Sequence, residues 1–72
     1  MGKRNTMYLR IVGYIKGYMV LEQVSAAEIA KSGHMSLSTF YERLRKPGDM
    51  RLDELAGIAR KMGVTIGEMI EG

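Results

Sequence analysis

The fold is decided by residues 25–47, SAAEIAKSGHMSLSTFYERLRKP. Ser25 and Glu28 have the spacing of a capping box, in which each side chain accepts a hydrogen bond from the backbone N–H of the other residue. A helix is therefore predicted to begin at Ser25. It is predicted to end near Gly33 and His34. Glycine tolerates the left-handed backbone of a tight turn, and histidine tolerates it better than a β-branched residue does.

A second short helix is predicted directly after this turn, over residues 37–45, with Ser36 as its N-cap. Pro47 ends it. The apolar stripe expected to pack inward is Leu37, Phe40, Tyr41 and Leu44. The opposite face carries Ser38, Thr39, Glu42, Arg45 and Lys46, with Arg43 at its border. The two helices form a predicted helix-turn-helix over about residues 25–46.

Three further helices and no strand are predicted in the rest of the chain. One is expected to begin after Asn5 or Thr6 and to fade between residues 19 and 23, one to cover residues 52–62, and a short one to open at the capping box formed by Thr65 and Glu68. Their expected inward-facing residues are Met7, Ile11, Tyr14, Ile15, Tyr18, Leu52, Leu55, Ile58, Ala59, Met62, Met69 and Ile70. The predicted fold class is all-α: a flexible basic arm over residues 1–5, then one compact bundle of five short helices over residues 6–72.

The first predicted helix has two glycines in its interior, Gly13 and Gly17. Each is expected to weaken the helix by about 1 kcal/mol relative to alanine. Residues this small would let another helix approach closely at that face.

The composition argues against several classes of protein. The 72 residues contain no cysteine and a single histidine, His34, so no disulfide framework, metal site or cofactor is expected. No apolar run approaches the roughly 20 residues that span a bilayer, and no secretory signal is found, so a cytoplasmic location is expected. The chain has no nucleophile with a partner base and no glycine-rich phosphate loop, so an enzyme is not expected.

The net charge of +3 is unevenly distributed. Residues 1–24 carry +3 and residues 25–50 carry +1, whereas residues 51–72 carry −1. A positive potential over the first two thirds of the chain suits an anionic partner.

Nearly fifty consecutive residues from Val24 onward fit one family pattern in a single register. The residues concerned are Ser25 with Ile29-Ala30, Met35-Ser36 followed by Ser38-Thr39-Phe40-Tyr41 and the basic residues up to Pro47, and Leu52-Asp53-Glu54-Leu55 with Ile58-Ala59 and Met62-Gly63-Val64-Thr65. In this respect the chain resembles the Cro/C1-type (XRE) helix-turn-helix family, the phage repressors, Cro proteins and related bacterial regulators with the lambda-repressor-like fold.

The resemblance implies a phage or prophage type of transcription regulator that binds double-stranded DNA, with residues 37–45 in the major groove. A homodimer on a pseudo-palindromic operator is expected, without a membrane or a small-molecule substrate. The expected base contacts are Ser38, Thr39, Glu42 and Arg45, and the expected phosphate contacts are Lys31, Ser36, Arg43 and Lys46. Lys3 and Arg4 are candidates for an arm in the minor groove.

Three residues depart from the family pattern. His34 stands where the family usually has glycine, and Ala26 stands where many members carry a glutamine that holds a phosphate. Leu37 occupies a position often used for base contact. It is expected to pack inward as part of the apolar stripe, and the alternative is contact with a thymine methyl group.

Other interpretations stay open at this point. Glu42 and Arg45 are three residues apart and can simply pair with each other on a solvated helix face. An antitoxin-like protein on the same fold, or a protein-interaction module that lost DNA binding, would show the same helices. The dimer surface is expected to come from the first helix, the fifth helix or the loops, and all three alternatives remain.

Overall fold

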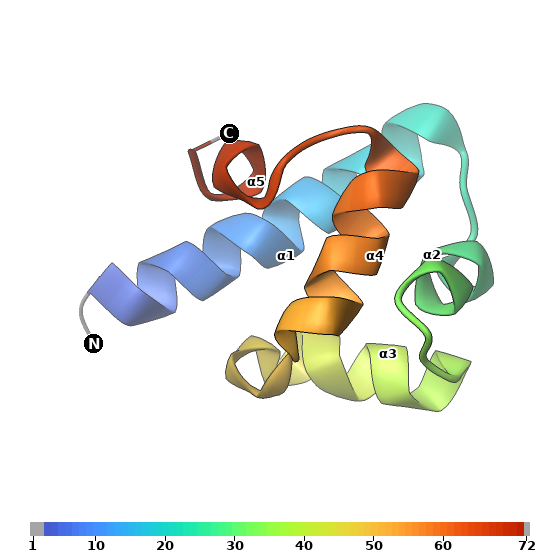
Figure 1. Cartoon of the computed structure of the whole chain (residues 1–72), viewed down its shortest axis with the longest axis horizontal. Coiled ribbons are helices and arrows are strands. Elements are labelled where there is room, and N and C mark those ends of the chain that lie inside the picture. The colour runs from blue at the N-terminus through green and yellow to red at the C-terminus, as the bar shows by residue number, and fades with distance from the viewer. Residues whose placement is uncertain (1–2, 72) are drawn as a thin grey trace.

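A computed structural model of the chain describes residues 3–71, with side chains described from Thr6 onward. The elements follow in the order α1 (Lys3–Glu22), α2 (Ala26–Ser32), α3 (Leu37–Arg45), a short 3-10 turn η1 (Pro47–Asp49), α4 (Leu52–Met62) and α5 (Ile66–Glu71). The described residues form five α-helices and no strand, which confirms the predicted all-α bundle (Figure 1).

The predicted starts of α2 and α5 are confirmed by their capping hydrogen bonds. The Ser25 hydroxyl accepts from the Glu28 N–H at 3.2 Å, and the Glu28 carboxylate accepts from the Ser25 N–H at 3.3 Å. Thr65 and Glu68 form the same reciprocal pair at the start of α5, at 3.1 and 2.8 Å. Each pair satisfies backbone N–H groups that the first turn of a helix leaves without partners, so the sequence signal and the local structure have one cause.

Helix α1 begins earlier than predicted. Its first residue is Lys3, so the backbone of residues 3–5, which we expected in a flexible arm, is helical. Residues 1 and 2 lie outside the described part of the chain. The predicted end between residues 19 and 23 is confirmed, because α1 ends at Glu22 and Gln23 takes a left-handed φ of 54°.

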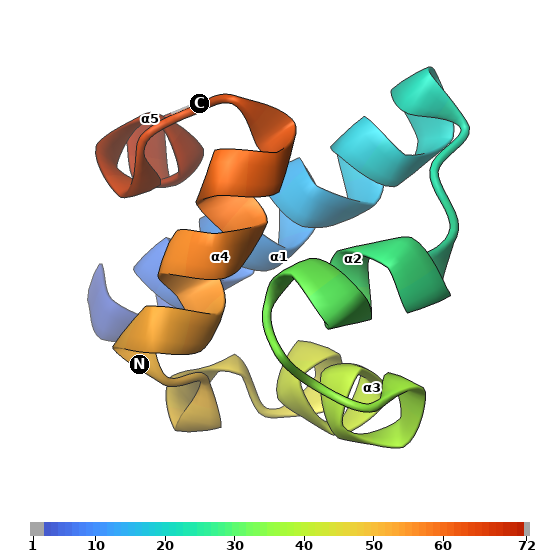
Figure 2. The same ribbon diagram turned by 45° about the vertical axis from the view of Figure 1, so that its right-hand side comes forward.

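The core is made by all five helices. Its fully buried large residues are Ile15, Ile29, Phe40, Ile58 and Met69. Helix α1 packs against α5 and η1, while α2 packs against α3 and α4 (Figures 1 and 2). Val12 is also buried, although its position was not assigned to the core. Leu52 was expected to be buried and is 73% exposed, at the first position of α4.

Helices α2 and α4 cross so closely that a glycine is required at the contact. A Cβ atom on Gly57 of α4 would collide with the backbone carbonyl of Ser32 at the end of α2. A Cβ atom on Gly33 would lie 3.0 Å from the Glu54 carbonyl oxygen and 3.1 Å from Ile58 Cγ1. This crossing fixes the position of α2, and with it the turn that leads into α3.

The turn between α2 and α3 requires close packing at one residue and a left-handed backbone at the next. Gly33 has an ordinary φ of −94°, whereas His34 takes the left-handed conformation with a φ of 62°. Gly33 is therefore needed for space, and His34 makes the turn. The Met35 N–H then donates to the Ala30 carbonyl at 2.9 Å, which closes the turn.

Candidate nucleic-acid interface

Helix α3 lies at one edge of the molecule. In two views that differ by 45°, no other helix lies beyond it (Figures 1 and 2). Phe40 anchors its inner face in the core with no exposed surface. Five residues of this helix are exposed to solvent, and we call the surface that they form the outer face of α3: Leu37, Ser38, Tyr41, Glu42 and Arg45.

The four expected base-contacting residues do not all lie in the same environment. Ser38, Glu42 and Arg45 are exposed. Glu42 and Arg45 form an ion pair, with Arg45 Nη2 2.8 Å from Glu42 Oε2, as the alternative interpretation allowed. Thr39 is half-buried, and its hydroxyl accepts a hydrogen bond from the Ser36 hydroxyl at 3.0 Å. Thr39 therefore belongs to the margin of the outer face.

Ser36 is occupied by the helix that it caps. Its hydroxyl oxygen accepts from the Thr39 N–H at 3.1 Å while its proton is donated to the Thr39 hydroxyl. This confirms Ser36 as the N-cap of α3. The hydroxyl keeps one free lone pair, so it can accept a further hydrogen bond but has no proton left to donate. The expected phosphate contact by the Ser36 side chain would require this arrangement to open, because a phosphate oxygen needs a donor.

Arg43, one of the expected phosphate contacts, is engaged inside the protein. Its Nε and Nη2 atoms donate to the two carboxylate oxygens of Glu54 at 3.0 and 3.3 Å, so the pair is bidentate. Glu54 also accepts from the Arg51 N–H at 2.9 Å. Glu54 is buried, and the pair joins α3 to the first turn of α4. Arg43 therefore holds α3 in place from its inner border.

The charges of this pair stabilise each other. The hydrogen bond from Arg43 lowers the pKa of Glu54, and the Arg51 N–H acts in the same direction, while burial opposes both. The same hydrogen bond raises the pKa of Arg43. Glu54 is thus ionised at neutral pH despite its burial, and its carboxylate is fully used inside the protein.

The other two expected phosphate-contacting residues, Lys31 and Lys46, are exposed. Lys31 lies in the last turn of α2, and Lys46 follows α3 directly as its C-terminal cap. Each therefore lies at an end of a helix in the unit formed by α2, the turn and α3. Lys3 and Arg4, the candidates for a minor-groove arm, lie in the helical backbone of α1, and their side chains are outside the described part of the structure.

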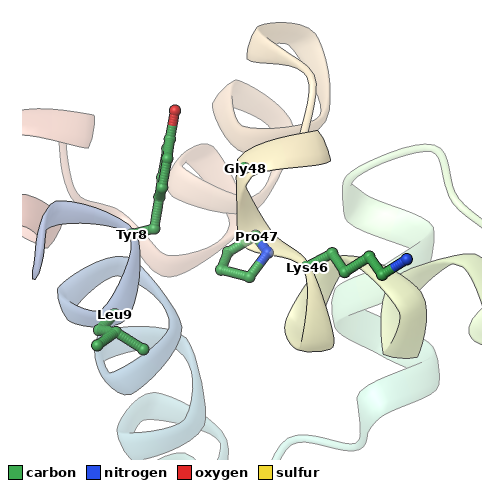
Figure 3. Close-up of a pocket in the computed structure, with 5 residues that line it drawn as sticks. All are labelled: Tyr8, Leu9, Lys46, Pro47 and Gly48. Carbon is green, nitrogen blue, oxygen red and sulfur yellow. The ribbon is translucent and has the colours of Figure 1, made fainter. Parts of the chain in front are cut away.

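An open pocket of about 410 Å³ adjoins the end of α3. It is lined by Tyr8 and Leu9 of α1 and by Lys46, Pro47 and Gly48 (Figure 3). The Tyr8 hydroxyl and the Lys46 ammonium group point in different directions (Figure 3). Since the polar groups do not converge, the pocket lacks the arrangement that holds a small polar ligand.

Leu37 does not pack inward as we expected. It is 42% exposed at the first position of α3. Tyr41 was also assigned to the inner stripe and is 51% exposed. Its ring lies against Phe40, with the ring centroids 6.1 Å apart. The outer face of α3 therefore has an apolar side that the sequence pattern did not predict.

Comparisons with protein-family models, with curated proteins and with solved structures give no match for this chain. In the described residues, no helix has the length and apolar character needed to cross a bilayer. No group of three or more acidic, histidine or cysteine side chains lies close enough to hold a metal ion within residues 3–71.

Sequence reasoning missed two residues that position the candidate interface. Glu54 was named only as one of the residues that fit the family pattern, and Gly57 was not singled out. Glu54 has the sequence signal of a capping residue, three positions after Arg51, but its partner Arg43 is eleven residues away. A local pattern contains no information about such a contact.

Proposed function

We propose that this protein binds double-stranded DNA at specific sequences and regulates transcription in the manner of a Cro-type repressor, with α3 in the major groove. The observation that carries the proposal is the outer face of α3, because it is exposed and lies at an edge of the molecule where a duplex can approach it (Figures 1 and 2). The major groove is wide enough for a helix and offers a distinct pattern of donors and acceptors for each base pair.

The polar residues of the outer face suit direct reading of bases. The Arg45 guanidinium can donate to O6 and N7 of guanine, and the Glu42 carboxylate can accept from the amino group of cytosine. Their ion pair at 2.8 Å holds both groups at the surface in a defined geometry. The pair is well exposed, so it contributes little to the stability of the fold. Replacing one partner of the pair with a DNA base therefore costs little free energy. A site that contains a G·C pair is therefore the expected target of this end of α3.

Lys31 and Lys46 suit contacts to the phosphate backbone. Such contacts release condensed counterions, so they raise the affinity for all sequences alike and make it depend on salt. They also orient a helix over the groove without selecting a sequence.

A second copy of the chain is part of the proposal. One unit of 72 residues offers few base contacts, whereas two copies about one helical turn of DNA apart combine their affinities. The target is then a pseudo-palindrome.

The decisive experiment is selection of bound duplexes from a random pool at two salt concentrations. Enrichment of a symmetric sequence at both concentrations supports the proposal. Binding that enriches no sequence and disappears at the higher salt concentration would show that the protein recognises only the phosphate backbone, and absence of binding at both would exclude DNA as the partner.

Two variants separate base reading from phosphate contact on the selected sequence. Arg45→Ala is expected to cost about 1–3 kcal/mol of binding free energy and to relax the preference at one base pair. Lys46→Ala is expected to weaken binding to all sequences alike and to reduce the salt slope by about one counterion. Lys61→Ala in the last turn of α4 removes the same charge as Lys46→Ala and serves as its control.

A specific observation also favours a protein partner. Val20 and Leu21, near the end of α1, are exposed, and an open pocket of about 450 Å³ that includes Leu21 runs along this helix. An antitoxin-like protein or an interaction module would use such a surface. For these functions, binding of the partner protein should survive neutralisation of the outer face of α3 by Arg45→Ala and Glu42→Gln together.

A further inference from the structure

The outer face of α3 contains two rows of side chains with different chemistry. Residues four apart in a helix lie one above the other, so Leu37, Tyr41 and Arg45 form one row, and Ser38 and Glu42 form the next. The first row is apolar over two of its three positions. Leu37 is 42% exposed and Tyr41 is 51% exposed, so both leave apolar surface open to solvent.

The polar groups of this face are few, and two of them are engaged with each other. The carboxylate of Glu42 holds Arg45, and the side chains of Ser36 and Thr39 hold each other at the start of the helix. In the first turns of α3, the exposed hydroxyl group of Ser38 belongs to the same outer face as the side chains of Leu37 and Tyr41.

The base edges of the major groove expose one apolar group, the C5 methyl of thymine. Among the base edges, that methyl group is the apolar partner for an exposed leucine or a half-exposed tyrosine ring that enters this groove. Burial elsewhere would cover polar base edges without giving them hydrogen bonds, which is unfavourable.

We propose that Leu37 and Tyr41 recognise thymine methyl groups, so that each half of the DNA site contains thymine next to the N-terminal half of α3. This inference rests on the proposed function and adds a preference to it. Leu37 and Arg45 are eight residues apart, which corresponds to about 12 Å along a helix. With about 3.4 Å per base pair, the selected thymine and the guanine read by Arg45 lie within about four base pairs of each other.

The test replaces each thymine of the selected duplex, one at a time, with deoxyuridine. This change removes the methyl group and leaves base pairing and all hydrogen-bonding groups unchanged. At one or two thymines in each half-site, affinity is expected to fall about fourfold, the value expected for one buried methyl-sized group. At the other thymines, affinity should change less than about twofold, because no apolar side chain covers them.

Leu37→Ala assigns the effect to a residue. The variant should bind the thymine duplex about tenfold more weakly and should no longer distinguish thymine from deoxyuridine at one position. Leu21→Ala is the matched control, because Leu21 is 82% exposed on the end of α1 that lies away from α3 (Figures 1 and 2). It should keep the full discrimination, and circular dichroism checks that both variants are folded.

The outcomes separate this inference from the proposed function. If selection enriches a sequence and no thymine in it responds to deoxyuridine, the inference is wrong and sequence-specific binding stands. If the enriched site has no thymine within reach of α3, the inference is also wrong. If selection enriches no sequence, both are wrong, and Leu37 and Tyr41 are then better explained as a contact for a protein partner.

Discussion

Two pairs of glycines differ sharply in their surroundings. Gly33 and Gly57 lie where α2 and α4 meet, and a Cβ atom on either would come within 3.0 Å or less of another residue. Gly13 and Gly17 lie in the middle of α1, and a Cβ atom on either would meet nothing within 4 Å among the described residues. The same residue type is therefore required by packing in one region and unfavourable for the helix in the other.

The difference shows which part of the chain is tightly specified. The contact between α2 and α4 positions the turn and, through it, the outer face of α3. The open face of α1 carries no such constraint within one copy of the protein. Our expectation that another helix would approach Gly13 and Gly17 is wrong for a single chain, and the glycine that allows a close helix crossing is Gly57.

The largest effect is expected from Gly57→Ala. The new methyl group would collide with the backbone carbonyl of Ser32, which cannot rotate away as a side chain could. Overpacking against backbone should lower the free energy of unfolding by about 3 kcal/mol or more, a large share of the stability of a chain this short. Urea denaturation followed by far-UV circular dichroism measures the loss, and a variant as stable as the wild type would show that α2 and α4 are not in contact.

A smaller loss that depends on pH is expected from Glu54→Gln. Glu54 has a lowered pKa in the folded protein, mainly because Arg43 donates to it. Its ionised form therefore stabilises the fold above its unfolded pKa of about 4.3, and this contribution is lost as the pH falls through the lower, folded pKa. The advantage of the wild type over Glu54→Gln should be constant between about pH 7 and pH 5 and should narrow below that range.

Thermal unfolding at several pH values measures this advantage. Glu71→Gln, an exposed site in α5, corrects for the change in net charge. An advantage of the wild type that stays the same down to pH 2 would mean that the ion pair with Arg43 does not stabilise the fold.

Gly17→Ala is expected to act in the opposite direction from Gly57→Ala. Since nothing described lies near this position, the substitution brings only the higher helix propensity of alanine, about 1 kcal/mol. The midpoint of thermal unfolding should rise by about 4–8 °C for a domain of this size. A loss of stability that grows with protein concentration would instead show that a second copy packs on this face of α1.

The sequence was sufficient for the helices that are defined by local chemistry. Capping pairs such as Ser25 with Glu28 and Thr65 with Glu68 involve residues three apart, so the pattern contains the whole interaction. The same applies to the limits of α3, which follow from its N-cap Ser36 and from Pro47.

The sequence was not sufficient where a residue's role depends on a distant element. Arg43 looks like a free cation beside Arg45, and only the fold brings it to Glu54. Leu37 continues an apolar stripe in the pattern, but its place at the very start of α3 leaves it outside the core. The outer face of α3 was therefore predicted in outline, while its apolar side and its anchoring contact were not.

The smallest effect is expected from His34→Gly, in the turn beside the packed contact. His34 holds a φ of 62°, a conformation that costs a residue with a Cβ atom about 1–2 kcal/mol and costs glycine almost nothing. Glycine also gains freedom in the unfolded chain, which offsets about 0.4–1 kcal/mol of this relief. A net gain of about 0.5 kcal/mol in the free energy of unfolding is expected, measurable by urea denaturation.

Gly33→Ala, one position earlier, should instead lose stability, because Gly33 is limited by space and not by its backbone angles. Opposite signs at two adjacent positions would show that this turn places its packing requirement and its backbone requirement on different residues, and a loss of stability in both variants would show that the His34 side chain contributes to the fold.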